Sequence, residues 1–144
     1  MRFTLADLLV AMTISAVLAL SLLPLAITTH RAMAVERGAE ELARELQAAR
    51  QLAVANGDTY KVLFDRTARA YYIMPEDAFS PSRRIQLPPG VEWVKLSTNP
   101  IFFYGSGRCP AGSTISLRYQ GSSCQVEIVV APHSGRVRLE WGSP

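Results

Sequence analysis

The sequence predicts an α+β protein in which a long N-terminal α-helix packs on an antiparallel β-sheet. Two observations lead to this prediction. Residues 8–27 form an uncharged apolar segment that continues into an amphipathic helical pattern, and after Gly57 the spacing of apolar residues changes to that of strands. A sheet with one buried face supplies the apolar surface that such a helix needs. The 144 residues suffice for a helical anchor and one globular domain.

The first half of this helix is expected to span a membrane. Residues 8–27 contain no charged side chain, and a helix of this length rises about 30 Å, which matches the hydrocarbon layer of a bilayer. A cleaved secretory signal would have a shorter apolar core followed by small residues, whereas this segment continues without a break. The segment is therefore expected to remain part of the working protein.

Asp7 directly precedes the uncharged segment. A carboxylate at the edge of a membrane-spanning helix is costly, so it usually has a partner or a function. The alternative is that Asp7 lies among lipid headgroups and acts as a favourable negative charge at the helix N-terminus. The residues alone leave both interpretations open.

The string from Phe3 to Leu9, Phe-Thr-Leu-Ala-Asp-Leu-Leu, resembles the N-terminus of type IV pilins and type II secretion pseudopilins. The resemblance implies that a prepilin peptidase cleaves before Phe3, that the new amino group is methylated, and that Asp7 neutralises the amino terminus of a neighbouring subunit during filament assembly. Pro24 lies where many pilins carry a proline, which implies a helix kink. Arg2 stands where the family has glycine, and Asp7 is one methylene shorter than the family's glutamate.

This resemblance also divides the chain into three parts. Residues 1–2 are expected to be a residual leader, residues 3–29 a transmembrane and polymerisation helix, and residues 30–144 an extracytoplasmic globular domain. The expected location is the inner membrane, which the chain crosses once with its N-terminus in the cytoplasm, and a filament after assembly.

Residues 35–55 carry apolar side chains in steps of three and four, which predicts an amphipathic helix continuous with the anchor. Its apolar stripe consists of Val35, Ala39, Leu42, Leu46, Ala49 and Ala53. Asn56-Gly57 provides a helix end. Strands are expected at residues 60–64, 70–74, 84–87, 91–96, 101–104, 114–119, 125–130 and 136–141. An antiparallel meander is the simplest topology for them.

Cys109 and Cys124 are the only two cysteines, and they enclose a turn-rich loop. Outside the cytoplasm they are expected to form a disulfide, which for a loop of about 15 residues would stabilise the domain by roughly 3 kcal/mol. The alternative is two free buried thiols. No metal site is expected, because no second cysteine lies at a two-residue spacing and His30 and His133 are far apart in sequence.

Three segments of the domain narrow the resemblance to the GspH/FimT family of minor pseudopilins. Residues 46–57, 101–107 and 135–138 are similar to the family's helix end, its aromatic strand with a glycine turn, and its final turn and strand. The resemblance implies a pilin-like fold and a minor subunit of a type II secretion or type IV pilus filament. The implied partners are other pilin or pseudopilin subunits, the inner membrane and prepilin peptidase.

Arg136 and Arg138 suggest a second function. Residues two apart on a strand point to the same face, so the two guanidinium groups would lie side by side after Gly135, which suits phosphate binding. Competence-associated members of the family are similar in the segment 135–138 and contact DNA with it, so DNA is an alternative partner. Otherwise the two arginines form a solvated face that guards a sheet edge.

An enzyme is not expected, and no cofactor is implied. The sequence contains no glycine-rich phosphate loop before a helix and no serine in a nucleophile-elbow context. His133, in a turn-rich segment, is the one candidate proton shuttle of the predicted sheet region, and a lone histidine in a turn is usually just solvated.

Overall fold

The structure, a computed structural model, describes residues 4–80 and 82–141, and for residues 22–27 it describes the backbone alone. Phe3 and the side chain of Pro24 lie outside this description. Their predicted roles in processing and in bending the helix stay predictions.

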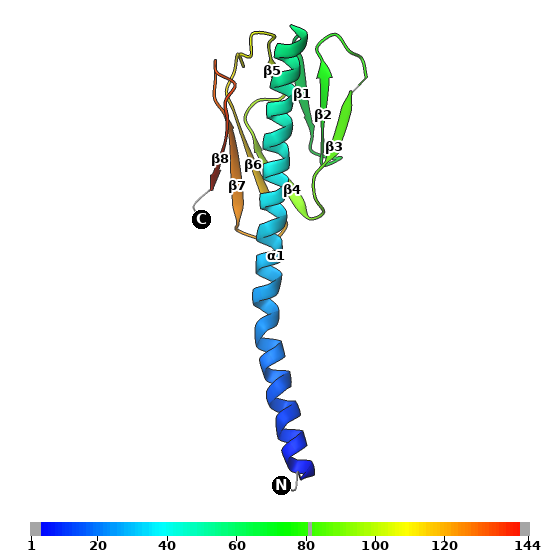
Figure 1. Cartoon of the computed structure of the whole chain (residues 1–144), viewed down its shortest axis with the longest axis vertical. Coiled ribbons are helices and arrows are strands. Elements are labelled where there is room, and N and C mark those ends of the chain that lie inside the picture. Colours follow the sequence, from blue (N-terminus) through cyan, green and yellow to red (C-terminus); the bar gives the residue numbers. More distant parts are fainter. Residues whose placement is uncertain (1–3, 81, 142–144) are drawn as a thin grey trace.

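α1 (Leu5–Asn56) is a single helix of 52 residues, which corresponds to a length of about 78 Å. It begins after the N-cap residue Thr4 and ends at Gly57, whose φ of 71° is the left-handed conformation typical of a helix C-cap. Figure 1 shows that the N-terminal half of α1 projects from the domain, whereas the C-terminal half lies against the strands. The predicted anchor and the predicted amphipathic helix therefore form one continuous rod.

Eight strands follow in the described part of the chain, close to the bounds that the sequence predicts. They are β1 (Tyr60–Asp65), β2 (Ala70–Pro75), β3 (Arg83–Gln86), β4 (Val91–Leu96), β5 (Ile101–Phe103), β6 (Ser113–Tyr119), β7 (Gln125–Val130) and β8 (Val137–Trp141). The predicted α+β class is confirmed.

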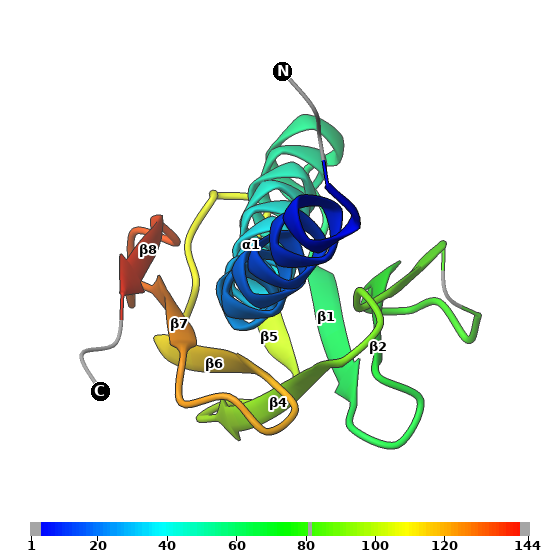
Figure 2. The same cartoon turned by 90° about the horizontal axis from the view of Figure 1, so that it is seen from below.

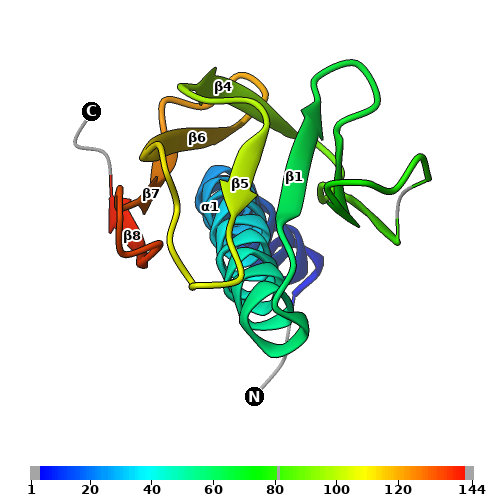
Figure 3. The same ribbon diagram turned by 90° about the horizontal axis from the view of Figure 1, so that it is seen from above.

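The strands form two four-stranded sheets, with the orders β3-β2-β1-β5 and β4-β6-β7-β8, and every pairing is antiparallel. The prediction of a single meander is wrong, because β5 crosses over to pair with β1 and leaves β4 to pair directly with β6. Figures 2 and 3 show the two sheets side by side around one side of α1. Buried side chains of both sheets belong to one cluster with the buried side chains of α1.

The predicted stripe of α1 lies at the centre of the core. Each of its six members is at most 1% exposed: Val35, Ala39, Leu42, Leu46, Ala49 and Ala53. They belong to one cluster with buried side chains from both sheets, among them Val62, Phe103 and Ile128. Full burial of a leucine or valine contributes about 1.5–3 kcal/mol, so this stripe is a main source of the affinity between helix and sheets.

Polar groups of the first sheet also face α1. Arg83 Nη2 of β3 lies 2.8 Å from Glu45 Oε1 of α1. Tyr71 of β2 is 1% exposed, and its hydroxyl has no hydrogen-bond partner among the described residues. Burial raises the pKa of Tyr71 well above its ordinary value, and the carboxylates of Glu41 and Glu45 add to the effect. The hydroxyl is therefore held neutral at the helix–sheet boundary.

Candidate functional site

The projecting half of α1 exposes a continuous apolar surface. Its large apolar side chains are all more than half exposed: Leu5, Leu8, Leu9, Val10, Met12, Ile14, Val17, Leu18 and Leu20. Soluble monomers rarely carry apolar patches of this extent, so such a surface marks an interaction with lipid or protein. In the part of the chain that the structure describes, no helix is both long and apolar enough to cross a membrane.

The hydroxyl groups of this half are satisfied within the helix. Thr13 Oγ1, Ser15 Oγ and Ser21 Oγ each donate a hydrogen bond of 2.8 Å to a backbone carbonyl three or four residues earlier. Hydroxyls bonded in this way do not need water. The polar residues of the segment are therefore compatible with apolar surroundings.

Asp7 lies in the first turn of the helix and is fully exposed. Its Oδ2 accepts hydrogen bonds from Thr4 N at 3.0 Å and from Thr4 Oγ1 at 2.8 Å, while Asp7 N donates back to Thr4 Oγ1. This capping box satisfies helix-terminal groups. A carboxylate has about four acceptor positions, so Asp7 retains capacity for a further partner.

The two candidate DNA-binding arginines occupy different settings. β8 begins at Val137, so Arg136 lies in the preceding turn, where its carbonyl accepts a hydrogen bond from Ala131 N. Arg138 is opposite Val129 on β7 and lies on the sheet face away from α1, because the alternate β7 residues are the buried ones. Both arginines are exposed, and neither forms a salt bridge within residues 4–80 and 82–141. β8 is an edge strand, as the alternative interpretation requires.

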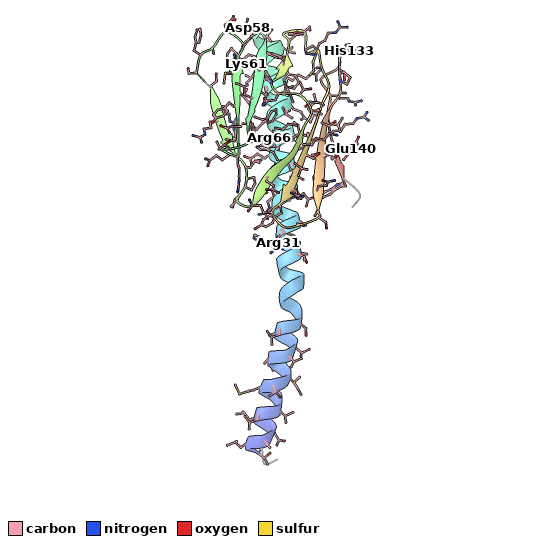
Figure 4. The ribbon with its side chains drawn as sticks, turned by 180° about the vertical axis from the view of Figure 1, so that it is seen from behind. Arg31, Asp58, Lys61, Arg66, His133 and Glu140 are labelled. Carbon is pink, nitrogen blue, oxygen red and sulfur yellow. The ribbon has the colours of Figure 1, made fainter. Side chains whose placement is uncertain are left out.

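Three acid-free segments converge beside this turn. Residues 46–57, 104–112 and 131–139 contain four arginines and no aspartate or glutamate, and we call them the basic corner. His133 N donates to Cys109 O at 2.8 Å, and Arg50 Nε donates to Gly107 O at 2.9 Å. Figure 4 places His133 at the distal end of the domain, with Glu140 nearer the base. The positive charge therefore collects at one corner of the distal end.

Arg50 is a residue that the sequence analysis did not single out as a site. With Arg136 it lines a hollow of about 230 Å³, to which Gln47, Gln51, Gly135 and Val137 also contribute. The local sequence signal was a single arginine, next to the buried stripe, in a stretch without acids. The contact with Gly107, 57 residues further along the chain, was not visible in that pattern.

The predicted disulfide is wrong, since Cys109 and Cys124 are both free thiols. Cys109 is buried, donates its thiol hydrogen to Ala111 O and lies beside His133, after the end of β7. Cys124 directly precedes β7 at its other end. A six-residue strand is about 20 Å long, whereas disulfide formation requires Cα atoms within about 7 Å. The length of β7 therefore keeps the two cysteines apart.

The fold and the exposed helix together define a class of protein. A long N-terminal helix, apolar and bare in its first half and packed on antiparallel sheets in its second, is the pilin-like architecture. Residues 38–135 match the family model of the type II transport protein GspH. The chain belongs to this family, which confirms the predicted relationship.

Solved structures show the same fold. The type IV minor pilin FimU of Pseudomonas aeruginosa is 20% identical with a TM-score of 0.60, over 73% of this chain and 91% of FimU. The minor pseudopilin EpsH of the Vibrio cholerae type 2 secretion system is 16% identical with a TM-score of 0.59, over 74% of this chain and 96% of EpsH. A search of curated proteins found no match to this sequence.

Proposed function

We propose that this chain is a minor pilin or minor pseudopilin, a subunit that supports filament assembly and protein secretion in a type II secretion or type IV pilus system. The observation that carries the proposal is the bare apolar half of α1 on a domain of the GspH family. The nine large apolar side chains of this half are each more than half exposed. Lipid would bury them from water, and so would the helices of other subunits.

The same surface explains how a subunit could move between membrane and filament. An apolar helix that leaves lipid for a filament core exchanges one dry environment for another, so packing between helices decides the preference. In this proposal the inner membrane holds α1 before assembly, with the N-terminus cytoplasmic and the sheets extracytoplasmic. Prepilin peptidase would cleave before Phe3.

Asp7 has the chemistry to fix the position of the helix in the filament. A charge within an apolar core is tolerable when it is paired, and the amino terminus of a neighbouring subunit is a cation at a matching depth. Asp7 also has a local role in the capping box with Thr4. The two roles need separate tests.

Three substitutions of Asp7 separate charge pairing from helix capping. For each variant, the amount of the protein is measured in the membrane fraction and in sheared filaments. Asp7→Ala removes both charge and cap, Asp7→Asn keeps an oxygen for the Thr4 bonds but loses the charge, and Asp7→Glu keeps the charge. We expect the alanine and asparagine variants in the membrane but absent from filaments, and the glutamate variant in both. Filaments that contain the asparagine variant at the wild-type level would contradict pairing and leave capping as the role.

A second candidate function is DNA binding through the segment 135–138, for DNA uptake in natural transformation. The observation that favours it is the basic corner, where exposed Arg136 and Arg138 have no acidic partner among the described residues. A positive surface of this kind attracts phosphate backbones, with affinity that falls steeply as salt rises.

The test is binding of the full chain in detergent micelles to duplex DNA at low and physiological salt. The double variant Arg136→Ala, Arg138→Ala should lose the salt-sensitive binding. Its matched control, Arg66→Ala with Arg69→Ala, removes the same charge from two exposed residues of the β1–β2 hairpin and should retain it. An equal loss in both double variants, or no binding at low salt, would leave Arg138 as a solvated edge residue.

A further inference from the structure

The hollow beside Arg50 joins the helix to the last turn of the chain. Gln47, Arg50 and Gln51 line it from the end of α1, and Gly135, Arg136 and Val137 line it from the turn into β8. Its volume of about 230 Å³ is below the roughly 300–1,000 Å³ of small-molecule pockets. The hollow therefore suits one small chemical group rather than a whole ligand.

Arg50 is held in a fixed place at this hollow. Its Nε donates to Gly107 O at 2.9 Å, and the side chain is partly buried. A Cβ built at Gly135 would lie 3.3 Å from Arg50 Cδ and Nε, and one built at Gly107 would lie 3.4 Å from Arg50 Nη2. Two glycines thus make room for the guanidinium group, which has five N–H donors and uses one of them on Gly107.

The charges at the hollow are unbalanced. Arg50 and Arg136 carry two positive charges, and neither forms a salt bridge in the described part of the chain. The three segments of the basic corner supply no acid. Both arginines line the same hollow, so an anion bound there would reduce the repulsion between their like charges. Arginine binds phosphate oxygens with paired, charge-assisted hydrogen bonds.

We propose that this hollow binds one phosphate group of a nucleic-acid backbone, with Arg50 and Arg136 as its two cationic arms and Gln47 and Gln51 as neutral donors. The inference rests on the DNA-binding candidate function. It differs from the sequence-based hypothesis in assigning the phosphate to Arg50 and Arg136 together, whereas Arg138, on the sheet face away from α1, contacts a separate phosphate.

The test measures affinity of the full chain in detergent micelles for a labelled DNA duplex across a salt series. Arg50→Gln and Arg136→Gln should each weaken binding about tenfold, as expected for loss of a charged hydrogen bond. Arg44→Gln is the matched control, because Arg44 is an exposed arginine of the same helix, paired with Glu40 outside the hollow. It should change affinity by less than about twofold.

The salt dependence tests whether both arginines hold the same phosphate. Each phosphate neutralised contributes a slope of about −0.9 in log K against log salt. The variant with both Arg50→Gln and Arg136→Gln should therefore lose about one such unit, and a loss of about two units would refute a shared phosphate. The triple variant Arg50→Gln, Arg136→Gln, Arg138→Gln should lose about two units, because Arg138 contacts a separate phosphate.

The remaining outcomes separate this inference from the function on which it rests. No binding by the wild-type chain at low salt would overturn both. Binding that Arg138→Gln weakens but Arg50→Gln leaves at the Arg44→Gln level would overturn this inference and keep DNA binding. Arg50→Lys retains the charge without the Nε bond to Gly107, so equal losses in the lysine and glutamine variants, with lowered thermal stability in both, would assign Arg50 a purely structural role.

Discussion

Replacement of Gly135 by alanine tests the close packing at the basic corner. Gly135 has a φ of 61°, and a Cβ there would lie 3.0 Å from Gly107 O and 3.3 Å from Arg50 Cδ. The left-handed conformation costs a residue other than glycine roughly 1–2 kcal/mol, and crowding in a packed site costs about 1–3 kcal/mol more. Gly135→Ala should therefore lower the free energy of unfolding by roughly 2–5 kcal/mol.

Gly121 provides the matched control for this substitution. Its φ is 72°, but a Cβ there would meet nothing within 4 Å. Gly121→Ala should thus cost only the conformational part, roughly 1–2 kcal/mol. Urea unfolding followed by fluorescence measures both variants, because Trp93 is 9% exposed and lies against Phe64 in the core. Equal costs for the two variants would refute the close packing of the turn against Gly107 and Arg50.

Two further predictions concern buried side chains. Cys124 should react with a thiol-specific mass tag in the native, unreduced protein, whereas Cys109 should react only after unfolding, because it is buried and burial raises the pKa of its thiol; labelling of Cys109 at the rate of Cys124 would contradict this. Tyr71→Phe should be neutral or stabilising, because the Tyr71 hydroxyl has no hydrogen-bond partner among the described residues. Tyr60→Phe should lower the free energy of unfolding by about 1 kcal/mol, because Tyr60 Oη accepts a hydrogen bond from Asn56. Because the pKa of Tyr71 is raised in the folded protein, the unfolded chain loses this proton at a lower pH than the folded protein does. The contribution of Tyr71 to the free energy of unfolding is therefore fully present below about pH 10 and falls above it. Urea unfolding midpoints measured between pH 8 and 11 should fall less in Tyr71→Phe than in the wild type, and identical falls would refute the burial argument.

The helix was predictable because its signal is local. The spacing of Leu42, Leu46 and Ala49 reports which face is buried, whatever that face packs against, and all of these residues are buried. Strand positions were predictable for the same reason. The partner of β5 was not, because a run of three residues does not encode whether it pairs with β1 or with a strand of the other sheet.

The candidate sites differ in the same way: some are recognisable from the sequence, and one is recognisable only from the fold. Asp7 and the arginines near β8 stand out by residue type and position. Arg50 becomes a candidate only when the fold brings Gly107 and Gly135 to it. The cysteines mislead for the opposite reason: their sequence spacing suits a bridge, but β6 lies between them in the chain as an extended strand. Spacing along the chain predicts proximity in turns and helices, and fails across a strand.

The continuity of α1 has a mechanical consequence. Tension applied to the projecting half of the helix passes along one unbroken hydrogen-bonded rod into the segment that holds the two sheets. There it acts parallel to the helix axis, so the contacts of the buried stripe are loaded together in shear rather than opened one after another. A chain built in this way resists pulling along the axis of α1 better than pulling across it.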